Sequence, residues 1–305
     1  MITIPPYLKK GDTIGIIAPA GFMSLDKMHA CIESLEEWGY NVVLGATTQT
    51  SSTNYFSGTD EERLLDFQQM LDDKNVHAIL CARGGYGVSR IIDRINFRKF
   101  RKAPKWVIGY SDITAFHTHV YARYKIASLH APMAAAFNDG ETGNEYIQSI
   151  RTALQGDAAE YECESHEWNR LGIAKGELVG GNLTLLVHLM GTPSDVRTKN
   201  KILFLEDVGE YLYNIDRMIL QLKRGGKLDR LAGLIIGGFT DMKDTERPFG
   251  KSVYELIRDH LKEYKYPVCF GFPVSHSKEN YALKVGASYQ LKVTSHETKL
   301  LEIMK

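Results

Sequence analysis

A serine, a glutamate and a histidine follow three predicted strands in this sequence, and side chains of these types can together form a nucleophilic hydroxyl group. Ser111 ends "VIGYS", Glu206 ends "ILFLE" and His276 ends "CFGFPVSH". In parallel α/β sheets, ligands bind beyond the carboxyl ends of the strands, where loops and helix N-termini converge. An imidazole can remove a serine proton, and a carboxylate can orient the imidazole and stabilise its charged form. The pattern therefore predicts a nucleophilic serine with Glu206 as its acid and His276 as its base.

Each of these side chains also has a simpler interpretation. Ser111 precedes an expected helix, and serine is a favoured N-cap residue. Glu206 is compatible with a strand-end ion pair, and His276 with a solvated loop side chain. Among the other histidines, His130 in "IASLHAPM" is the second candidate for a functional imidazole. The catalytic hypothesis therefore depends on the fold bringing the strand ends together.

A second motif, "CARGGYGVSR", places Gly84, Gly85 and Gly87 between a predicted strand and a predicted helix. It lacks a Walker lysine and a G-x-G-x-x-G spacing, so it does not favour a nucleotide phosphate site. Adjacent glycines at a helix N-terminus can direct backbone N–H groups at a developing oxyanion. Gly84, Gly85 and the N–H of Asp112 are therefore predicted to form an oxyanion hole. A tight turn that requires positive φ explains the glycines equally well.

The elements that must position these residues follow an α/β pattern. In the first half, apolar runs such as "TIGIIAP" and "KWVIGYS" alternate with amphipathic segments, as in β-α units around a parallel sheet. One helix is expected from Met28 to about Gly39, and another after a capping box formed by Thr59 and Glu62. The second half continues with "LVGGNLTLLVHLMG", the strand "KILFLED" and an alternating tail.

The regular spacing of apolar residues fades in the middle of the chain, which predicts two domains joined by a linker region. We expect an N-terminal α/β domain at residues 1–150 that carries the nucleophile and a linker region at residues 151–175. A C-terminal domain at residues 176–305 is expected to carry the acid and the base. Its alternating tail predicts a sheet with one face exposed to water.

Composition argues against several classes of protein. Lys and Arg total 37 and Asp and Glu total 37, so no net positive charge attracts nucleic acid. The four cysteines are scattered without zinc-ligand spacing, which predicts reduced thiols and no metal site. The apolar run near the N-terminus is too short for a signal peptide or a membrane span. These features predict a cytoplasmic protein without a nucleic-acid or membrane partner.

Five motifs, in this order and at these separations, resemble the LD-carboxypeptidase family of serine peptidases, which cut murein peptides during cell-wall recycling. They are "ARGGYG", "IGYSDITA", "ELVGGNLTLL", "LFLEDVGEYLYNIDRMILQL" and "GFPVSH". The resemblance implies a flavodoxin-like N-terminal domain with a parallel sheet and a smaller C-terminal α/β domain of mixed sheet. It also implies Ser111 as the nucleophile, Glu206 as the triad acid and His276 as the base.

The resemblance further implies a reaction and a mode of assembly. Family members hydrolyse the amide before the terminal D-alanine of murein tetrapeptides, need no cofactor or metal, and are commonly homodimers. Because such a substrate ends in a carboxylate, Arg83 is a candidate to bind it; an ion pair with a nearby acid suits this arginine equally well. We therefore expect a serine LD-carboxypeptidase that acts on a murein peptide as a homodimer.

Two other functions are compatible with the sequence. A microcin-immunity-type relative within the family cuts an amide beside an adenylate and uses an aromatic platform. Trp168 in "SHEWNRLG" could be such a platform, or it could cover the junction of the domains. Alternatively, two α/β domains around a cleft could form a non-catalytic small-ligand binding protein. A serine, an acid and an imidazole at separate strand ends favour an enzyme, because a binding protein does not need this combination.

Overall fold

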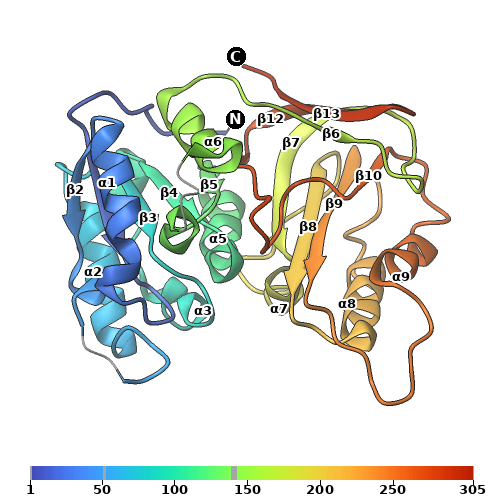
Figure 1. Cartoon of the computed structure of the whole chain (residues 1–305), viewed down its shortest axis with the longest axis horizontal. Helices are drawn as coiled ribbons and strands as arrows, with labels where there is room; N and C mark the ends of the chain where they lie inside the picture. Colours follow the sequence, from blue (N-terminus) through green and yellow to red (C-terminus); the bar gives the residue numbers. More distant parts are fainter. Residues whose placement is uncertain (1, 51–52, 139–142, 305) are drawn as a thin grey trace. The chain divides into compact units, whose positions relative to one another are not determined.

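The computed structural model describes residues 2–50, 53–138 and 143–304 (Figure 1). The chain forms two compact units, each with its own sheet and helices. A short return of the chain supplies one strand to the first unit, so the units are not two consecutive segments. Unit 1 is Met1–Asp157 with Tyr281–Gly286, and unit 2 is Ala158–Asn280 with Ala287–Lys305.

Unit 1 contains a six-stranded sheet in the order β11-β5-β4-β3-β1-β2. Neighbouring strands are parallel except for β11 and β5. The order of the parallel strands is that of a flavodoxin-like fold, which confirms the expected N-terminal architecture. Leu80 and Ile108 are buried on one face, and their neighbours Ile79 and Val107 are buried on the other, as expected for strands covered on both faces. The strands are β1 (Thr13–Ile17), β2 (Asn41–Leu44), β3 (Ala78–Cys81), β4 (Trp106–Gly109), β5 (Ser128–His130) and β11 (Leu283–Val285).

Helices cover both faces of this sheet. Leu35 of α1 and Ile150 of α6 pack into one apolar core with alternate strand residues. In a separate cluster, Phe67 of α2 stacks on Phe116 of α5 with the ring centroids 5.2 Å apart. The predicted capping box begins α2. The helices are α1 (His29–Glu37), α2 (Asp60–Asp72), α3 (Val88–Ile91), α4 (Arg98–Lys102), α5 (Thr114–Tyr124) and α6 (Glu145–Gln155), with 3₁₀ turns at Leu25–Met28, Ala46–Thr48, Ile92–Arg94, Ser111–Ile113 and Ala134–Phe137.

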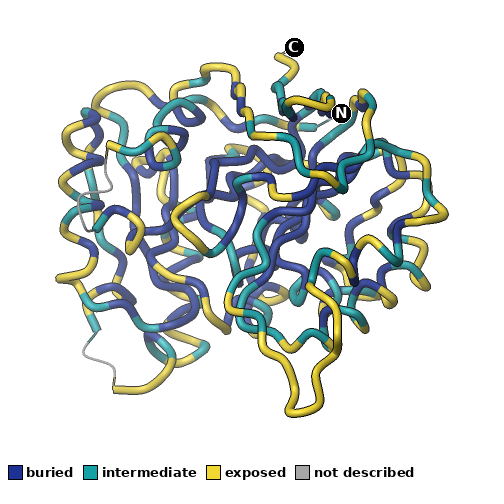
Figure 2. Tube along the Cα trace, turned by 45° about the vertical axis from the view of Figure 1, so that its right-hand side comes forward, coloured by how far each residue is buried: buried dark blue, intermediate teal, exposed yellow. Residues whose placement is uncertain are grey.

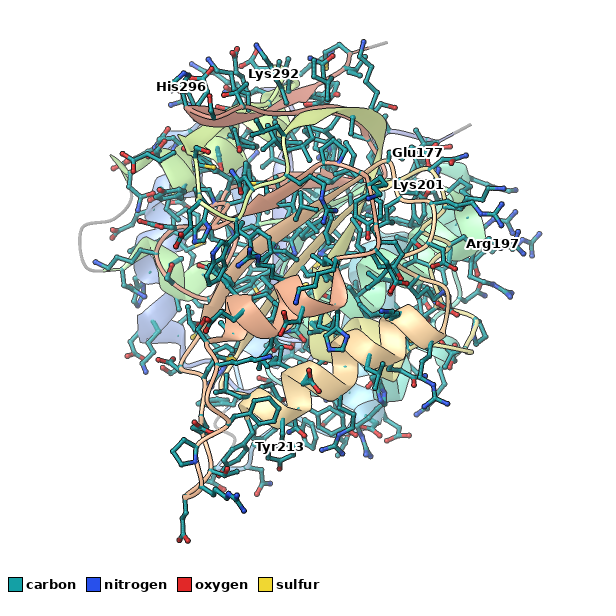
Figure 3. All side chains as sticks on the ribbon, turned by 90° about the vertical axis from the view of Figure 1, so that its right-hand side faces the viewer. Glu177, Arg197, Lys201, Tyr213, Lys292 and His296 are labelled. Atoms are coloured by element: carbon teal, nitrogen blue, oxygen red, sulfur yellow. The ribbon has the colours of Figure 1, made fainter. Side chains whose placement is uncertain are left out.

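Unit 2 contains a seven-stranded sheet in the order β10-β9-β8-β7-β12-β13-β6. The pairs from β7 to β10 are parallel and the remaining pairs are antiparallel, which confirms the expected mixed sheet. Lys201, just before β8, forms a 2.6 Å ion pair with Glu177 of β7 (Figure 3). The elements are β6 (Glu160–Glu164), β7 (Gly172–Asn182), α7 (Leu183–His188), β8 (Ile202–Val208), α8 (Leu212–Arg224), β9 (Gly233–Thr240), α9 (Val253–His260), β10 (Val268–Phe270), β12 (Ser288–Val293) and β13 (Glu297–Glu302).

The distribution of buried residues follows the sheets. Figure 2 shows buried backbone along the strands and exposed residues on loops and outer helix faces. Residues 151–175, predicted as a linker, contain the end of α6 and the whole of β6. Within residues 2–50, 53–138 and 143–304, no helix is both long and apolar enough to cross a membrane.

Candidate active site

Ser111 lies at a strained corner of unit 1, two residues after β4 ends. Its φ is +61°, a left-handed conformation that costs a non-glycine residue about 1–2 kcal/mol. The N-cap positions of the following 3₁₀ turn and of α5 are Tyr110 and Ile113, and neither makes a side-chain capping hydrogen bond. Ser111 is therefore not the cap of either helix. The corner has the character of the strained strand-to-helix turns that expose nucleophilic serines in hydrolases.

Gly84 packs directly against this corner. A Cβ on Gly84 would lie 3.1 Å from the Ser111 Cβ and 3.3 Å from the Asp112 nitrogen, so a larger residue would push the loop away. Gly85 has a φ of +98°, so the tight-turn explanation applies to it. The structure thus brings the "RGGYG" loop beside the serine. The oxyanion role of Gly84, Gly85 and the Asp112 amide stays a prediction.

The Asp112 side chain is fully buried and binds the same loop. Its Oδ2 accepts a 2.8 Å hydrogen bond from the Val88 N–H. Burial raises the pKa of Asp112 to about 6, while hydrogen bonds from loop amides and the charge of Arg63 act in the opposite direction. Arg63 is also fully buried and donates to the Gly87 carbonyl at 3.1 Å. Sequence reasoning missed Arg63, because an arginine three residues after Asp60 on a helix predicts only a surface ion pair.

Two buried histidines, His117 and His130, border the backbone that leads to the serine. His117 Nε2 donates to the Gly109 carbonyl at 2.7 Å, and its Nδ1 accepts a 2.8 Å hydrogen bond from the Ser128 hydroxyl. Burial lowers the pKa of His117 to about 4, so this residue stays neutral and holds the end of β4. His130, the second candidate base, lies in β5 with its ring centroid 5.9 Å from that of Tyr110.

Glu206 and His276 come together in unit 2. Glu206 is fully buried in β8, and its Oε2 accepts a 2.6 Å hydrogen bond from His276 Nδ1. Burial disfavours the imidazolium, but the hydrogen bond and charge of Glu206, together with Asp207 and Asp241, raise the pKa of His276 above its ordinary value. Because Nδ1 carries the hydrogen donated to Glu206, Nε2 is the nitrogen whose lone pair can accept a proton.

Asp207 fastens the start of α7 to β8. Its Oδ1 accepts from the Asn182 side chain, and its Oδ2 accepts from the Thr184 backbone and hydroxyl, each at 2.9 Å. Glu210 also contacts the Thr184 hydroxyl, at 3.3 Å. Of these three acids, Glu206 is the one whose carboxylate binds the imidazole. Sequence reasoning missed Asn182 and Asp207, although "GGN" and "LED" place polar residues at two strand ends.

The loop that carries His276 packs against two glycines of β9. The Gly238 N–H donates to the Val274 carbonyl at 2.9 Å. A Cβ on Gly237 would lie 2.2 Å from the Val274 oxygen, and a Cβ on Gly238 would lie 2.4 Å from the Ser275 Cβ. Only glycine allows this close approach, which fixes the backbone immediately before His276.

Gly238→Ala is therefore expected to displace Ser275 and weaken the hydrogen bond between His276 and Glu206. An NMR titration should show the pKa of His276 moving down toward its ordinary value, since the partner that raises it moves away. Urea denaturation should show a loss of about 1–3 kcal/mol from overpacking. Gly143→Ala is the control, because a Cβ there meets nothing within 4 Å. An unchanged His276 titration in Gly238→Ala would contradict this account of the loop.

Arg83, the candidate for a substrate carboxylate, is exposed. One of its N–H groups donates to the Phe22 carbonyl at 2.9 Å. In the part of the chain that the structure describes, Arg83 has no ion pair with an acidic side chain. Its role in binding a substrate carboxylate stays a prediction.

Trp168 lies within an aromatic cluster of unit 2. Its ring centroid is 5.2 Å from that of His166 and 6.2 Å from that of Phe270. The Arg258 guanidinium lies over the tryptophan ring, 5.4 Å from its centroid. One face of the indole is therefore covered.

The candidate residues fall into two groups. Ser111, Gly84 and Asp112 belong to unit 1, whereas Glu206 and His276 belong to unit 2. Among the described residues, no three His, Cys, Asp or Glu side chains converge as a metal site. Each group holds residue types that are used in nucleophilic catalysis by a serine, and their catalytic roles stay a prediction.

The sequence is similar to known carboxypeptidases. The sequence matches the family models of the LD-carboxypeptidase N-terminal domain at residues 14–131 and the LD-carboxypeptidase C-terminal domain at residues 175–291. It is 36% identical to a probable murein peptide carboxypeptidase of Bacillus subtilis, over 98% of this chain and 94% of that protein. It is 25% identical to the microcin C7 self-immunity protein MccF of Escherichia coli, over 97% and 94%.

A solved structure extends the likeness to three dimensions. The crystal structure of muramoyltetrapeptide carboxypeptidase from Oxalobacter formigenes matches with a TM-score of 0.85 and 28% identity, over 95% of this chain and 98% of that chain. The two family models together cover most of the sequence. The chain therefore belongs to the LD-carboxypeptidase family.

Proposed function

We propose that this protein is a serine LD-carboxypeptidase that releases D-alanine from murein tetrapeptides. Ser111 is the nucleophile, His276 the general base and Glu206 the acid that orients it. The observation that carries the proposal is the 2.6 Å hydrogen bond between His276 Nδ1 and the buried Glu206, which directs the basic Nε2 away from the carboxylate. The names of the relatives from Bacillus subtilis and Oxalobacter formigenes support the substrate class.

In the proposed reaction, Ser111 Oγ attacks the carbonyl carbon before D-alanine while His276 Nε2 takes the hydroxyl proton. The N–H groups of Gly84, Gly85 and Asp112 bind the oxyanion. Collapse of the tetrahedral intermediate breaks the C–N bond, and His276 passes the proton to the leaving amine. Water, deprotonated by the same imidazole, then hydrolyses the acyl ester and frees the serine.

Three further features belong to this proposal. Arg83 binds the carboxylate of the terminal D-alanine through its remaining N–H groups. The protein acts as a homodimer, which light scattering after gel filtration would test. It acts in the cytoplasm on recycled murein peptides, which cell fractionation would test.

The direct test is incubation of the protein and its Ser111→Ala variant with free L-Ala-D-Glu-meso-diaminopimelate-D-Ala. Mass spectrometry of D-alanine is the readout, and release by the wild type alone supports both substrate and nucleophile. Release by neither protein would contradict the proposed substrate. If a serine-directed fluorophosphonate also failed to label Ser111, a non-catalytic binding protein would become the better description.

The second candidate function is hydrolysis of a peptidyl- or aminoacyl-nucleotide. It is favoured by the 25% identity to the microcin C7 self-immunity protein MccF and by the half-buried indole of Trp168. The guanidinium of Arg258 on one face of that indole leaves at most the other face for a base. Cleavage of an aminoacyl sulfamoyl adenosine without cleavage of the tetrapeptide would favour this function.

The rate should depend on pH through His276. A general base must be neutral, so kcat/KM should rise with pH through the pKa of this residue. Because Glu206 raises that pKa, the midpoint should lie above the ordinary histidine value of 6.5. Glu206→Gln removes the negative charge and should move the midpoint to lower pH. Profiles of D-alanine release between about pH 5 and 9 would measure this; equal midpoints in the two proteins would contradict the pairing.

A further inference from the structure

The peptide group between Gly87 and Val88 is held at both ends by buried side chains of opposite charge. Its carbonyl oxygen accepts a 3.1 Å hydrogen bond from Arg63 Nη1, and its N–H donates a 2.8 Å hydrogen bond to Asp112 Oδ2. Arg63 and Asp112 are both fully buried. Hydrogen bonds to charged groups are roughly twice as strong as neutral ones, so the two contacts favour a single orientation of this peptide.

Arg63 also binds two neighbouring loops. Its Nη1 donates to the Pro19 carbonyl at 2.7 Å, and its Nε donates to the Gly58 carbonyl at 3.3 Å. Its charge is balanced by an ion pair with Asp60. A Cβ on Gly87 would lie 2.7 Å from Nη1, so a larger residue at that position would displace the guanidinium. The arginine therefore joins the loops that follow β1 and β3.

The held peptide is connected to the serine corner at two points. Asp112 follows Ser111 in the chain, so the carboxylate that binds the loop belongs to the corner itself. At the other end of the loop, the Gly84 backbone packs against the Ser111 Cβ. The Gly84 carbonyl also accepts a 3.0 Å hydrogen bond from the Gly21 N–H. A shift of the glycine loop would therefore change its distance from the serine.

We infer that Arg63 and the Asp112 side chain are positioning residues that hold the "RGGYG" loop where its amides can bind an oxyanion formed at Ser111. This inference rests on the proposed function and extends it to two charged side chains that exchange no proton with the substrate. Loss of a single oxyanion donor lowers kcat by about 10²–10³-fold in serine hydrolases. Misalignment of the "RGGYG" loop should lower kcat by a factor of that order.

The test compares Arg63→Lys and Asp112→Asn with Arg94→Met in D-alanine release. Lysine keeps the charge of Arg63 but cannot reach three carbonyls at once, and asparagine keeps the shape of Asp112 without its charge. Arg94 is the control, because it is an exposed arginine that also pairs with an acid of α2, Glu61. In the two variants of the buried residues, called the buried variants below, kcat should fall about 10²-fold with KM within about threefold of wild type. Arg94→Met should keep both constants.

Two further readouts separate positioning from a general loss of structure. Exchange of the Val88 amide hydrogen should accelerate in both buried variants, while amides of β4 keep their protection. In the wild type, kcat should also fall more steeply as the pH is lowered, because Asp112, with a pKa of about 6, gains a proton. Arg63 and the Cys81 thiol face this carboxylate. The extra acid ionisation should disappear in Asp112→Asn.

The rate of Ser111 labelling by a fluorophosphonate tests the inference even without peptide turnover, because its phosphoryl oxygen occupies an oxyanion hole. Labelling slowed in both buried variants supports the inference, whether or not the wild type releases D-alanine. The inference would be overturned if both buried variants kept the labelling rate and the kcat of the wild type. It would also be overturned if the Val88 amide exchanged faster in these variants while neither the labelling rate nor kcat changed. Absence of D-alanine release from the wild type would contradict only the proposed function.

Discussion

Ser111→Ala is expected to lower kcat for D-alanine release by on the order of 10⁶-fold, because deletion of the nucleophile disables the triad as a unit. Tetrapeptide binding, measured by calorimetry, should stay within about threefold of wild type, since the hydroxyl acts mainly in the transition state. Alanine keeps the Cβ of serine and hence the same strain at a φ of +61°, so the free energy of unfolding should not change.

Ser111→Gly is the matched control for this variant. Glycine adopts the left-handed conformation without strain, so this variant should be as inactive as Ser111→Ala but more stable by about 1 kcal/mol in urea denaturation. The pair of variants thus separates the chemistry of the hydroxyl from the strain of the corner. A loss of kcat of less than about tenfold in both would remove Ser111 from the nucleophile's role.

His276→Ala is expected to lower kcat by a comparable amount, about 10⁵–10⁶-fold, because no other group then takes the serine proton. Glu206→Gln should lose about 10⁴-fold, since the amide can favour the wrong imidazole tautomer and cannot stabilise the imidazolium. The double variant should be little worse than His276→Ala, because Glu206 acts through the imidazole. Single-turnover kinetics with the tetrapeptide would measure the chemical step directly.

Glu210→Gln is the control for the acid. Glu210 lies near the same strand end, but it binds the Thr184 hydroxyl and the Asn214 side chain. The kcat of the Glu210→Gln variant should stay within about threefold of wild type. A loss in Glu210→Gln as large as that in Glu206→Gln would show that the assignment of the acid is wrong. Additive losses in the double variant of Glu206 and His276 would show that these residues do not act together.

The fold was largely predictable from local sequence patterns. Apolar runs such as "TIGIIAP" and "KWVIGYS" became β1 and β4, because short stretches buried on both faces are continuous in apolar residues. The capping box of Thr59 and Glu62 starts α2, because both of its hydrogen bonds form within one turn of helix. Most of the alternating tail became β12 and β13, as expected for a sheet with one exposed face. Its first residues, Leu283–Val285, instead became the buried strand β11 of the first unit.

The candidate site was predictable only in part. Strand ends identified Ser111, Glu206 and His276 as candidates, since polar residues after buried strands are conspicuous in the sequence. Arg63 was not identifiable, because its pattern on α2 is that of an ordinary surface charge. Its contacts with carbonyls of Pro19 and Gly87 exist only after three loops have come together.

The sequence by itself determined the succession of strands and helices along the chain and the presence of a serine, an acid and an imidazole within or after strands. These features depend on residues within a few positions of one another, so local propensity and periodicity specify them. The tertiary structure alone decided that Glu206 binds His276, 70 residues away, and that Asp112 binds the Val88 amide, 24 residues away. It also decided the left-handed conformation of Ser111. These contacts and this conformation depend on which residues, distant in the sequence, are buried together, because a buried charge is stable only when it is paired or hydrogen-bonded.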